Sequence, residues 1–201
     1  MSDFKNFTQY EQFTKAGDWQ AICRLNNVNL EVLGARKELK VLSRYLEPGE
    51  VVFALTSGNM NQTLTSNSSD FGINTWLVVL TNERFLFLDC AMLSNSVDTQ
   101  SIRHDRVQAV SASQGWVLGK IMVDLGARVV TIDNCQKATI APIADLANKW
   151  LRHCEQRTQN SVKPAPDLVM DRLERLAALH ATGGLTAEEF TLAKRKLLAA
   201  D

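Results

Sequence analysis

The stretch that most constrains the fold is residues 75–89, TWLVVLTNERFLFLD. Two runs rich in β-forming residues, 76–80 and 84–88, flank Thr81-Asn82-Glu83. Asn tolerates left-handed dihedrals, and Thr and Asn can bond their own backbone. The pattern predicts a β-hairpin with a short loop. Both arms are apolar nearly throughout, so we expect them to lie deep in a sheet. A lone hairpin is unstable in water, so neighbouring segments must add strands.

The neighbouring segments supply those strands. Short β-type runs cover residues 50–57, 97–102, 107–113, 120–125 and 128–132, and Gly126-Ala127 joins the last two as a second hairpin. With the central hairpin this makes seven strands at short spacing, which favours a barrel or sandwich over βαβ units. From Pro142 the pattern becomes helical. Its apolar face should plug one open end of the sheet and consists of Ile143, Leu146, Ala147, Trp150 and Cys154.

The N-terminal third is predicted to be helical. Residues 29–46 carry an apolar stripe at 3-4-3-4 spacing (Val32, Ala35, Leu39, Leu42 and Leu46), and Glu47-Pro48-Gly49 ends this helix. On another face lies a basic row of Arg36, Lys40 and Arg44. We interpret the row as a solvated face, with contact to an anionic surface as the alternative. Aromatic residues within 1–27 are expected to pack on the main body.

A separate small unit is predicted at the end of the chain. Residues 159–167, QNSVKPAPD, have the composition of an extended linker. Beyond them, Gly183-Gly184 ends one amphipathic helix, and Thr186 with Glu189 forms a capping box that starts another. A hairpin of this size cannot bury its apolar faces alone, so we expect a partner there. The predicted partner-binding residues are Val169, Leu173, Leu176, Leu185, Phe190 and Leu197.

Composition excludes several classes of protein. Lys+Arg and Asp+Glu both number 22, and no segment is strongly basic, which argues against a general nucleic-acid binder. The basic triplet 194–196 lies at a helix C-terminus, where cations are favourable. No signal peptide is recognised, and no apolar run reaches the ~20 residues of a membrane span. The cysteines are scattered, so we expect reduced thiols and a cytoplasmic protein.

No catalytic arrangement emerges from the sequence. G-x-S-x-G, H-E-x-x-H and phosphate-loop motifs are all missing. His104-Asp105 are adjacent on the chain, where side chains usually point apart, and His153-Cys154 has the same weakness. His180 lies on an apolar stripe. Three histidines without metal-ligand spacing argue against zinc. We therefore expect no enzyme activity, no cofactor, no metal and no small-molecule substrate.

Two segments resemble known families. LTNERFLFLD at 80–89, followed by matching segments from 101 to 121, resembles bacterial pleckstrin-homology (PH) domains of the YokE-like type. That resemblance implies an α+β fold with a bent, seven-stranded antiparallel barrel capped by a C-terminal helix. LERL at 173–176, GGLTAEEF at 183–190 and KRKLL at 194–198 resemble the SHOCT (short C-terminal) domain. The expected domains are an N-terminal helical segment (1–47), the PH-like domain (48–157), a linker (158–167) and the SHOCT hairpin (168–201).

Both families resemble binding or assembly modules and bring no catalytic residues. The first hypothesis is therefore a cytoplasmic protein-binding barrel whose hairpin oligomerises or tethers it. The alternative is a peripheral membrane adaptor that uses the basic row. Eukaryotic PH domains hold phosphates with basic residues near their first loop. The corresponding loop here, 58–72, has no Lys or Arg and carries Asp70, which disfavours a headgroup site. The partner, the copy number, the pathway, a chromosomal or phage origin, and the docking of residues 1–45 stay open.

Overall fold

A computed structural model describes residues 4, 6–61, 75–91, 96–162 and 166–198. The chain forms two compact units, residues 1–153 and 154–201. The boundary between them falls inside one long helix, α4 (Lys137–Val162). Each unit is described below by itself.

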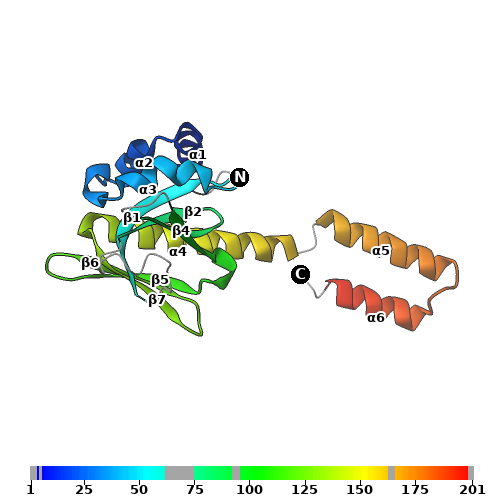
Figure 1. Ribbon diagram of the computed structural model, residues 1–201. Helices are drawn as coiled ribbons and strands as arrows, with labels where there is room; N and C mark the ends of the chain where they lie inside the picture. Colours follow the sequence, from blue (N-terminus) through cyan, green and yellow to red (C-terminus); the bar gives the residue numbers. More distant parts are fainter. Residues whose placement is uncertain (1–3, 5, 62–74, 92–95, 163–165, 199–201) are drawn as a thin grey trace. The chain divides into compact units, whose positions relative to one another are not determined.

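The first unit is built on a seven-stranded antiparallel sheet with strand order β4-β3-β2-β1-β7-β6-β5 (Figure 1). The strands are β1 (Val52–Asn61), β2 (Trp76–Thr81), β3 (Arg84–Cys90), β4 (Val97–Arg103), β5 (Ala109–Gln114), β6 (Gly119–Asp124) and β7 (Val129–Cys135). The predicted α+β class, the seven strands and the PH-like architecture are confirmed. The central hairpin is β2–β3, and Leu80 lies opposite Phe85 in its register.

Strand β1 joins the two halves of the sheet by changing partners. Its first part pairs with β2 as far as Gly58, and its end, Asn59 to Asn61, pairs with β7. A Cβ on Gly58 would lie 2.6 Å from the carbonyl oxygen of Asp133 and 2.7 Å from Cys135 Sγ. Only glycine lets the two backbones approach this closely. The strand therefore extends four residues past the predicted end at Ser57.

Helix α4 packs its apolar face into the sheet. Ile140, Ile143, Ala147 and Trp150 are all buried on it, and Figure 1 shows α4 between the β1–β4 and β5–β7 layers. Pro142 was expected in the first turn, but the helix begins five residues earlier, so this proline lies inside it. The C-terminal end also differs from the prediction: α4 continues through residues 159–162, which we expected to be extended.

The predicted single helix over residues 29–46 is wrong. The structure has a 3₁₀ turn η1 (Leu30–Leu33), helix α3 (Arg36–Val41) and a 3₁₀ turn η2 (Leu42–Arg44). Gly34 interrupts them with φ of +65°, a left-handed conformation that cannot continue a helix. Of the predicted stripe, Ala35 and Leu42 are buried, while Leu39 and Leu46 are half-buried; the side chain of Val32 lies outside the described residues.

The N-terminal helices α1 (Phe7–Ala16) and α2 (Trp19–Leu25) dock on the first unit. Phe4 packs against Phe53 of β1 and Trp150 of α4, with ring centroids 4.8 and 5.1 Å apart. Tyr10 packs on Phe53 as well, at 5.5 Å. Residues from 1–45, whose docking the sequence left open, thus pack on the barrel in this structure.

Polar side chains also fasten the N-terminal region to the first strand. Thr14 Oγ1 accepts the N–H of Val52 at 2.9 Å, and Asn26 Nδ2 donates to the carbonyl of Phe53 at 2.8 Å. These groups lie in the part of β1 that pairs only with β2. The helices therefore cover a strand edge that would otherwise leave backbone groups unpaired.

The second unit is a helical hairpin of α5 (Pro166–Ala181) and α6 (Ala187–Leu198). Gly183 has φ of +77°, as expected for a helix C-terminus. The predicted capping box is present: Thr186 Oγ1 accepts the N–H of Glu189 at 3.3 Å, and Glu189 Oε2 accepts the N–H of Thr186 at 3.0 Å. Each bond satisfies a donor that the first turn of α6 would leave without a partner.

Candidate functional site

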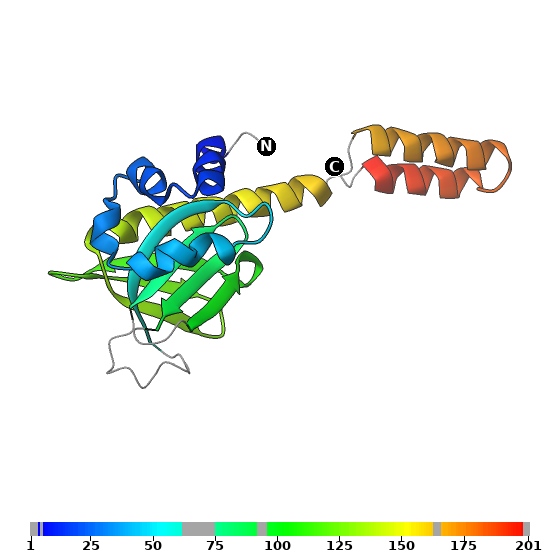
Figure 2. The ribbon, with the colours of Figure 1, turned by 45° about the horizontal axis from the view of Figure 1, so that its top comes forward.

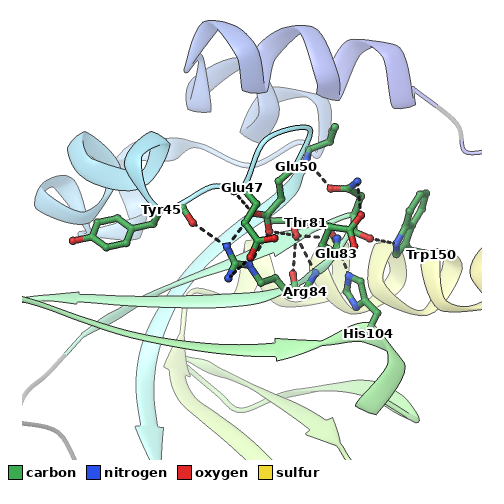
Figure 3. Close-up of polar contacts among 10 residues, drawn as sticks. Tyr45, Glu47, Glu50, Thr81, Glu83, Arg84, His104 and Trp150 are labelled. Carbon is green, nitrogen blue, oxygen red and sulfur yellow. Dashed lines mark hydrogen bonds and ion pairs between the residues drawn. The ribbon is translucent and has the colours of Figure 1, made fainter.

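The segment LTNER, residues 80–84, forms the β2–β3 turn, and the side chain of Thr81 organises it. Thr81 Oγ1 accepts the N–H groups of Glu83 at 3.1 Å and Arg84 at 3.0 Å. The same hydroxyl donates to Glu50 Oε1 at 2.7 Å (Figure 3). A serine or threonine at this place closes a turn by bonding the backbone just after it. Thr81 therefore both shapes the β2–β3 turn and connects it to the start of β1.

An ion pair forms the centre of this polar cluster. Arg84 donates to Glu50 through Nε and through Nη2, each at 3.0 Å, which is a two-pronged contact with one carboxylate. Arg84 Nη2 also donates to the Tyr45 carbonyl at 2.9 Å, and Glu47 Oε1 lies 3.3 Å from Nη1. The Glu50 side chain is 0% exposed and that of Arg84 15%. The cluster therefore holds a buried charge with its counter-charge.

Asn82, also in this turn, links the cluster to two further parts of the chain. Asn82 Oδ1 accepts the N–H of Val51 at 2.7 Å, and the Asn82 N–H donates to the Val51 carbonyl at 2.9 Å. Trp150 of α4 donates its Nε1 proton to the Asn82 carbonyl at 2.7 Å. The turn is thus bonded to the chain before β1 and to the helix that follows β7.

His104, in the 3₁₀ turn η3 (His104–Arg106), completes the cluster. Its Nε2 lies 2.8 Å from the Thr81 carbonyl oxygen. A carbonyl only accepts, so Nε2 carries a proton and donates it to this oxygen. Among the described residues the buried Nδ1 has no hydrogen-bond partner. Burial lowers the pKa of this imidazole, an effect that the bond to Thr81 and the nearby carboxylates partly oppose.

The electrostatics of the cluster fit a structural role. Burial raises the pKa of Glu50, but hydrogen bonds from Arg84, the Glu47 backbone and Thr81 outweigh it, so the pKa lies below the usual range. The carboxylate is therefore charged, and its partners are within the same chain. Burial also raises the pKa of the Cys23 and Cys135 thiols to about 12, which leaves them protonated and unreactive. The LTNER turn therefore connects the β2–β3 hairpin to the start of β1 and to α4 through bonds within one chain.

The predicted basic row lies on the surface. Arg36 and Lys40 belong to α3 and Arg44 to η2, and all three are exposed. None of them forms an ion pair with another residue of the described ranges. Of the loop predicted to lack a phosphate site, residues 58–61 belong to β1; the rest, including Asp70, falls outside the described residues.

The predicted partner-binding residues lie in the hairpin and are only partly covered. Leu173, Leu176, Leu185, Phe190 and Leu197 are half-buried; the side chain of Val169 lies outside the described residues. His180 stacks near Phe190, with ring centroids 4.8 Å apart. Four other apolar side chains, which sequence analysis did not select, are 50–60% exposed: Met170, Leu179, Leu192 and Leu198.

A second surface was missed from the sequence. The β5–β6 hairpin ends in a turn closed by the bond from Gly115 N–H to the Leu118 carbonyl, at 2.9 Å. On this turn Trp116 is 97% exposed and Val117 77%. Lys137 Nζ donates to the Trp116 carbonyl and fixes the turn to the start of α4. The end of this hairpin projects from the first unit (Figures 1 and 2). Glycines on both sides indicated a bend but not its exposure.

The edge of β5 is partly occupied by an α4 side chain. Asn148 Oδ1 accepts the N–H of Val110 at 3.0 Å, and Asn148 Nδ2 donates to the Val110 carbonyl at 2.6 Å. The amide thus bonds this residue as a neighbouring strand would. Beyond it, residues 111–114 are all exposed.

Within the described ranges, no helix is long and apolar enough to cross a membrane. The same residues contain no group of three or more His, Cys, Asp or Glu side chains that could hold a metal ion.

The bent seven-stranded sheet with its capping helix defines a PH-type barrel. The family model described as "Bacterial PH domain" matches residues 46–149. The chain therefore belongs to the bacterial PH domain family, whose fold is generally that of a non-enzymatic binding module. None of the curated proteins matches this chain.

The solved structures that match this chain include the following two. One is the C-terminal domain of an unknown protein from Leishmania infantum, with TM-score 0.37 and 13% identity, covering 61% of this chain and 99% of that one. The other is a pleckstrin homology domain from Shewanella amazonensis SB2B, with TM-score 0.36 and 13% identity, covering 59% and 97%.

Proposed function

We propose that this protein is a non-enzymatic, cytoplasmic binding and assembly module. Its PH unit presents a rigid surface to other proteins, and its α5–α6 hairpin, which resembles SHOCT, oligomerises or tethers that unit. Joining modules in this way raises avidity without new contacts at either site. Membership of the bacterial PH family supports the binding role, since the fold typically mediates protein or lipid interaction.

One observation carries the assembly part of the proposal: the described side chains of the hairpin form no buried core. From residue 170 to 198, every described side chain is half-buried or exposed. Leu176 and Phe190, two of the predicted partner-binding residues, are among the half-buried ones. A unit this small does not reach ordinary stability from its own core. A second hairpin or a partner helix would cover the remaining apolar surface.

Light scattering tests this proposal. The full chain is expected to be multimeric, and Leu176→Glu is expected to lower its molar mass. The matched control is Ala178→Glu, which introduces the same charge at an exposed position on the opposite side of α5. Far-UV circular dichroism of both variants separates lost assembly from lost helix. A full chain that is monomeric, or an unchanged mass for Leu176→Glu, would contradict the assembly role.

The membrane-adaptor alternative is favoured by one observation, the exposure of Arg36, Lys40 and Arg44 without ion pairs in the described structure. Three charges at a membrane surface contribute about 1 kcal/mol each at most, and salt screens them. Flotation with vesicles containing anionic lipid tests the idea, with a triple Gln variant as control. If the wild-type chain does not float with these vesicles, the membrane-adaptor alternative is wrong.

A further inference from the structure

We propose that the free edge of β5 pairs with the same edge of a second copy of this chain, in a two-fold antiparallel arrangement centred on Ser113. The proposal deepens the assembly function above by assigning an interface to the PH unit. It does not depend on the α5–α6 hairpin.

The sheet has two edges, β4 and β5, and they differ in how they are protected. Strand β4 carries Asp98 and Arg103, and charges of this kind keep edge strands from pairing with other molecules. Residues 109–119, which include β5 and its turn, contain no charged side chain and no proline. Ser111, Ala112 and Ser113 are small and exposed, so a second backbone can approach.

The hydrogen-bond pattern shows which groups of β5 face outward. Both backbone groups of Val110 bond to Asn148, so they point away from β6. Alternate residues of an antiparallel strand direct their N–H and C=O to the same side. Ala112 and Gln114 therefore present theirs outward too. No hydrogen bond to these groups comes from any other described residue.

A two-fold axis at Ser113 uses all of these groups. It places Ala112 of one copy opposite Gln114 of the other, and each such pair exchanges two N–H···O=C bonds. Ala112 and Gln114 of each copy each supply one outward N–H group. The two copies therefore form four backbone hydrogen bonds, and no outward group of these residues is left unpaired. Ser113 meets its own equivalent at the close spacing of a pair without hydrogen bonds, which a small residue tolerates. Pairing stops at Val110, because Asn148 already occupies it.

Self-pairing also accounts for the exposed turn. The same register places Trp116 of each copy toward Val110 of the other. An exposed Trp on a fixed turn is the kind of residue that contributes most to protein interfaces. Because no charge lies between residues 109 and 119, the two-fold brings no like charges together.

The decisive variant is Ser113→Glu in the full chain. Within one chain position 113 lies opposite Lys120, so a glutamate there is favourable for the fold. In the two-fold pair it meets a second glutamate. We expect association between β5 edges to weaken about tenfold or more, and light scattering to show a lower molar mass than for the wild type. Ser113→Gln controls for side-chain size, and Thr99→Glu places the same charge on the exposed β4 edge; both should keep the wild-type mass.

Fluorescence gives a second readout. Trp19, Trp76 and Trp150 are at most 8% exposed, so Trp116 dominates quenching by iodide. Quenching of the wild type should decrease as protein concentration rises, while that of Ser113→Glu should not. An unchanged mass for Ser113→Glu, or quenching independent of concentration in the wild type, overturns the proposal. The β5 edge would then be a binding site for a peptide of another protein.

Different results contradict the two assembly proposals, so each can be tested by itself. A response to Ser113→Glu without a response to Leu176→Glu supports β5 pairing and removes the hairpin role. The opposite result removes β5 pairing alone. A wild-type chain that is monomeric at all concentrations contradicts both.

Discussion

Replacing Arg84 by methionine tests whether the LTNER cluster stabilises the barrel. The substitution keeps the aliphatic stem but removes the guanidinium. It leaves the Glu50 carboxylate, whose side chain is 0% exposed, without its two bonds at 3.0 Å, and frees the Tyr45 carbonyl from its bond at 2.9 Å. Removing one partner of a buried ion pair typically costs 3–5 kcal/mol, because the other charge stays buried without compensation.

We therefore expect Arg84→Met to lower the free energy of unfolding at pH 7 by about 3–5 kcal/mol. For a unit of this size that is a fall in Tm of about 10–15 °C. The control is Arg103→Met: Arg103 is 64% exposed and lies 3.9 Å from Asp105, so its loss should cost less than ~1 kcal/mol. Adding Glu50→Gln to Arg84→Met should recover part of the stability by removing the unpaired charge.

The assay is urea unfolding followed by tryptophan fluorescence. All four tryptophans lie within residues 1–153, so the signal reports the first unit alone. The pH dependence is a further check. Without Arg84, burial raises the pKa of Glu50, so the folded variant takes up a proton before its unfolded chain does, and its stability rises as pH falls toward 4.5. In the wild type the pKa of Glu50 is lowered, so the stability of the charged pair is kept over this range and is lost only below about pH 4.5. The difference between them should therefore narrow from pH 7 to pH 5. A cost below ~1 kcal/mol at pH 7, or one equal to that of Arg103→Met, would refute the reasoning.

Three further predictions concern other parts of the first unit. Asn148→Ala should cost about 1–3 kcal/mol in urea unfolding, because it leaves both backbone groups of buried Val110 unpaired. Burial lowers the pKa of His104, so below about pH 6.5 the unfolded state binds a proton that the folded state does not. The free energy of unfolding should therefore decrease as the pH is lowered below 6.5, and His104→Gln should make this decrease smaller. Gly58→Ala should lower Tm by several degrees, because its Cβ would meet the Asp133 carbonyl at 2.6 Å.

Matched controls make these predictions specific. Lys149→Ala changes the exposed neighbour of Asn148 on α4 and should alter stability by less than ~0.5 kcal/mol. A cost for Asn148→Ala within that range would contradict the edge-binding role of the amide. An unchanged pH slope in His104→Gln would show that another group causes the acid sensitivity. For Gly58→Ala, a Tm equal to the wild type would mean that β1 and β7 can separate without cost.

The sequence predicts the sheet well because each strand can be recognised from the pattern of its own residues. The runs on both sides of Thr81-Asn82-Glu83 are buried wherever they pair, so their apolar composition identifies them without tertiary information. The capping box of Thr186 and Glu189 was likewise predictable, since both partners lie within one turn.

Features that depend on distant contacts were not predictable. The apolar spacing in 29–46 fits one helix, but Gly34 in a left-handed conformation breaks it, and packing on the sheet stabilises short pieces instead. The polar composition at the end of β1 predicts a loop, and only pairing with β7, a distant segment of the chain, makes these residues a strand. Glu50 and Arg84 are 34 residues apart, and nothing local indicates that they pair. Trp116 lies on the turn of the β5–β6 hairpin, and composition does not indicate that its side chain is 97% exposed.

The aromatic contact between Phe4 and Trp150 has a consequence for synthesis of the chain. The ribosome makes Phe4 146 residues before Trp150, which follows only after β1 to β7. At 5–20 residues per second, the N-terminal helices wait roughly 7–30 s for their docking site. During that interval Phe4 and Phe7 lack the Trp150 ring against which they pack, and their side chains are accessible to chaperones. The last helix of the barrel therefore sets the moment at which the first helices can fold into place.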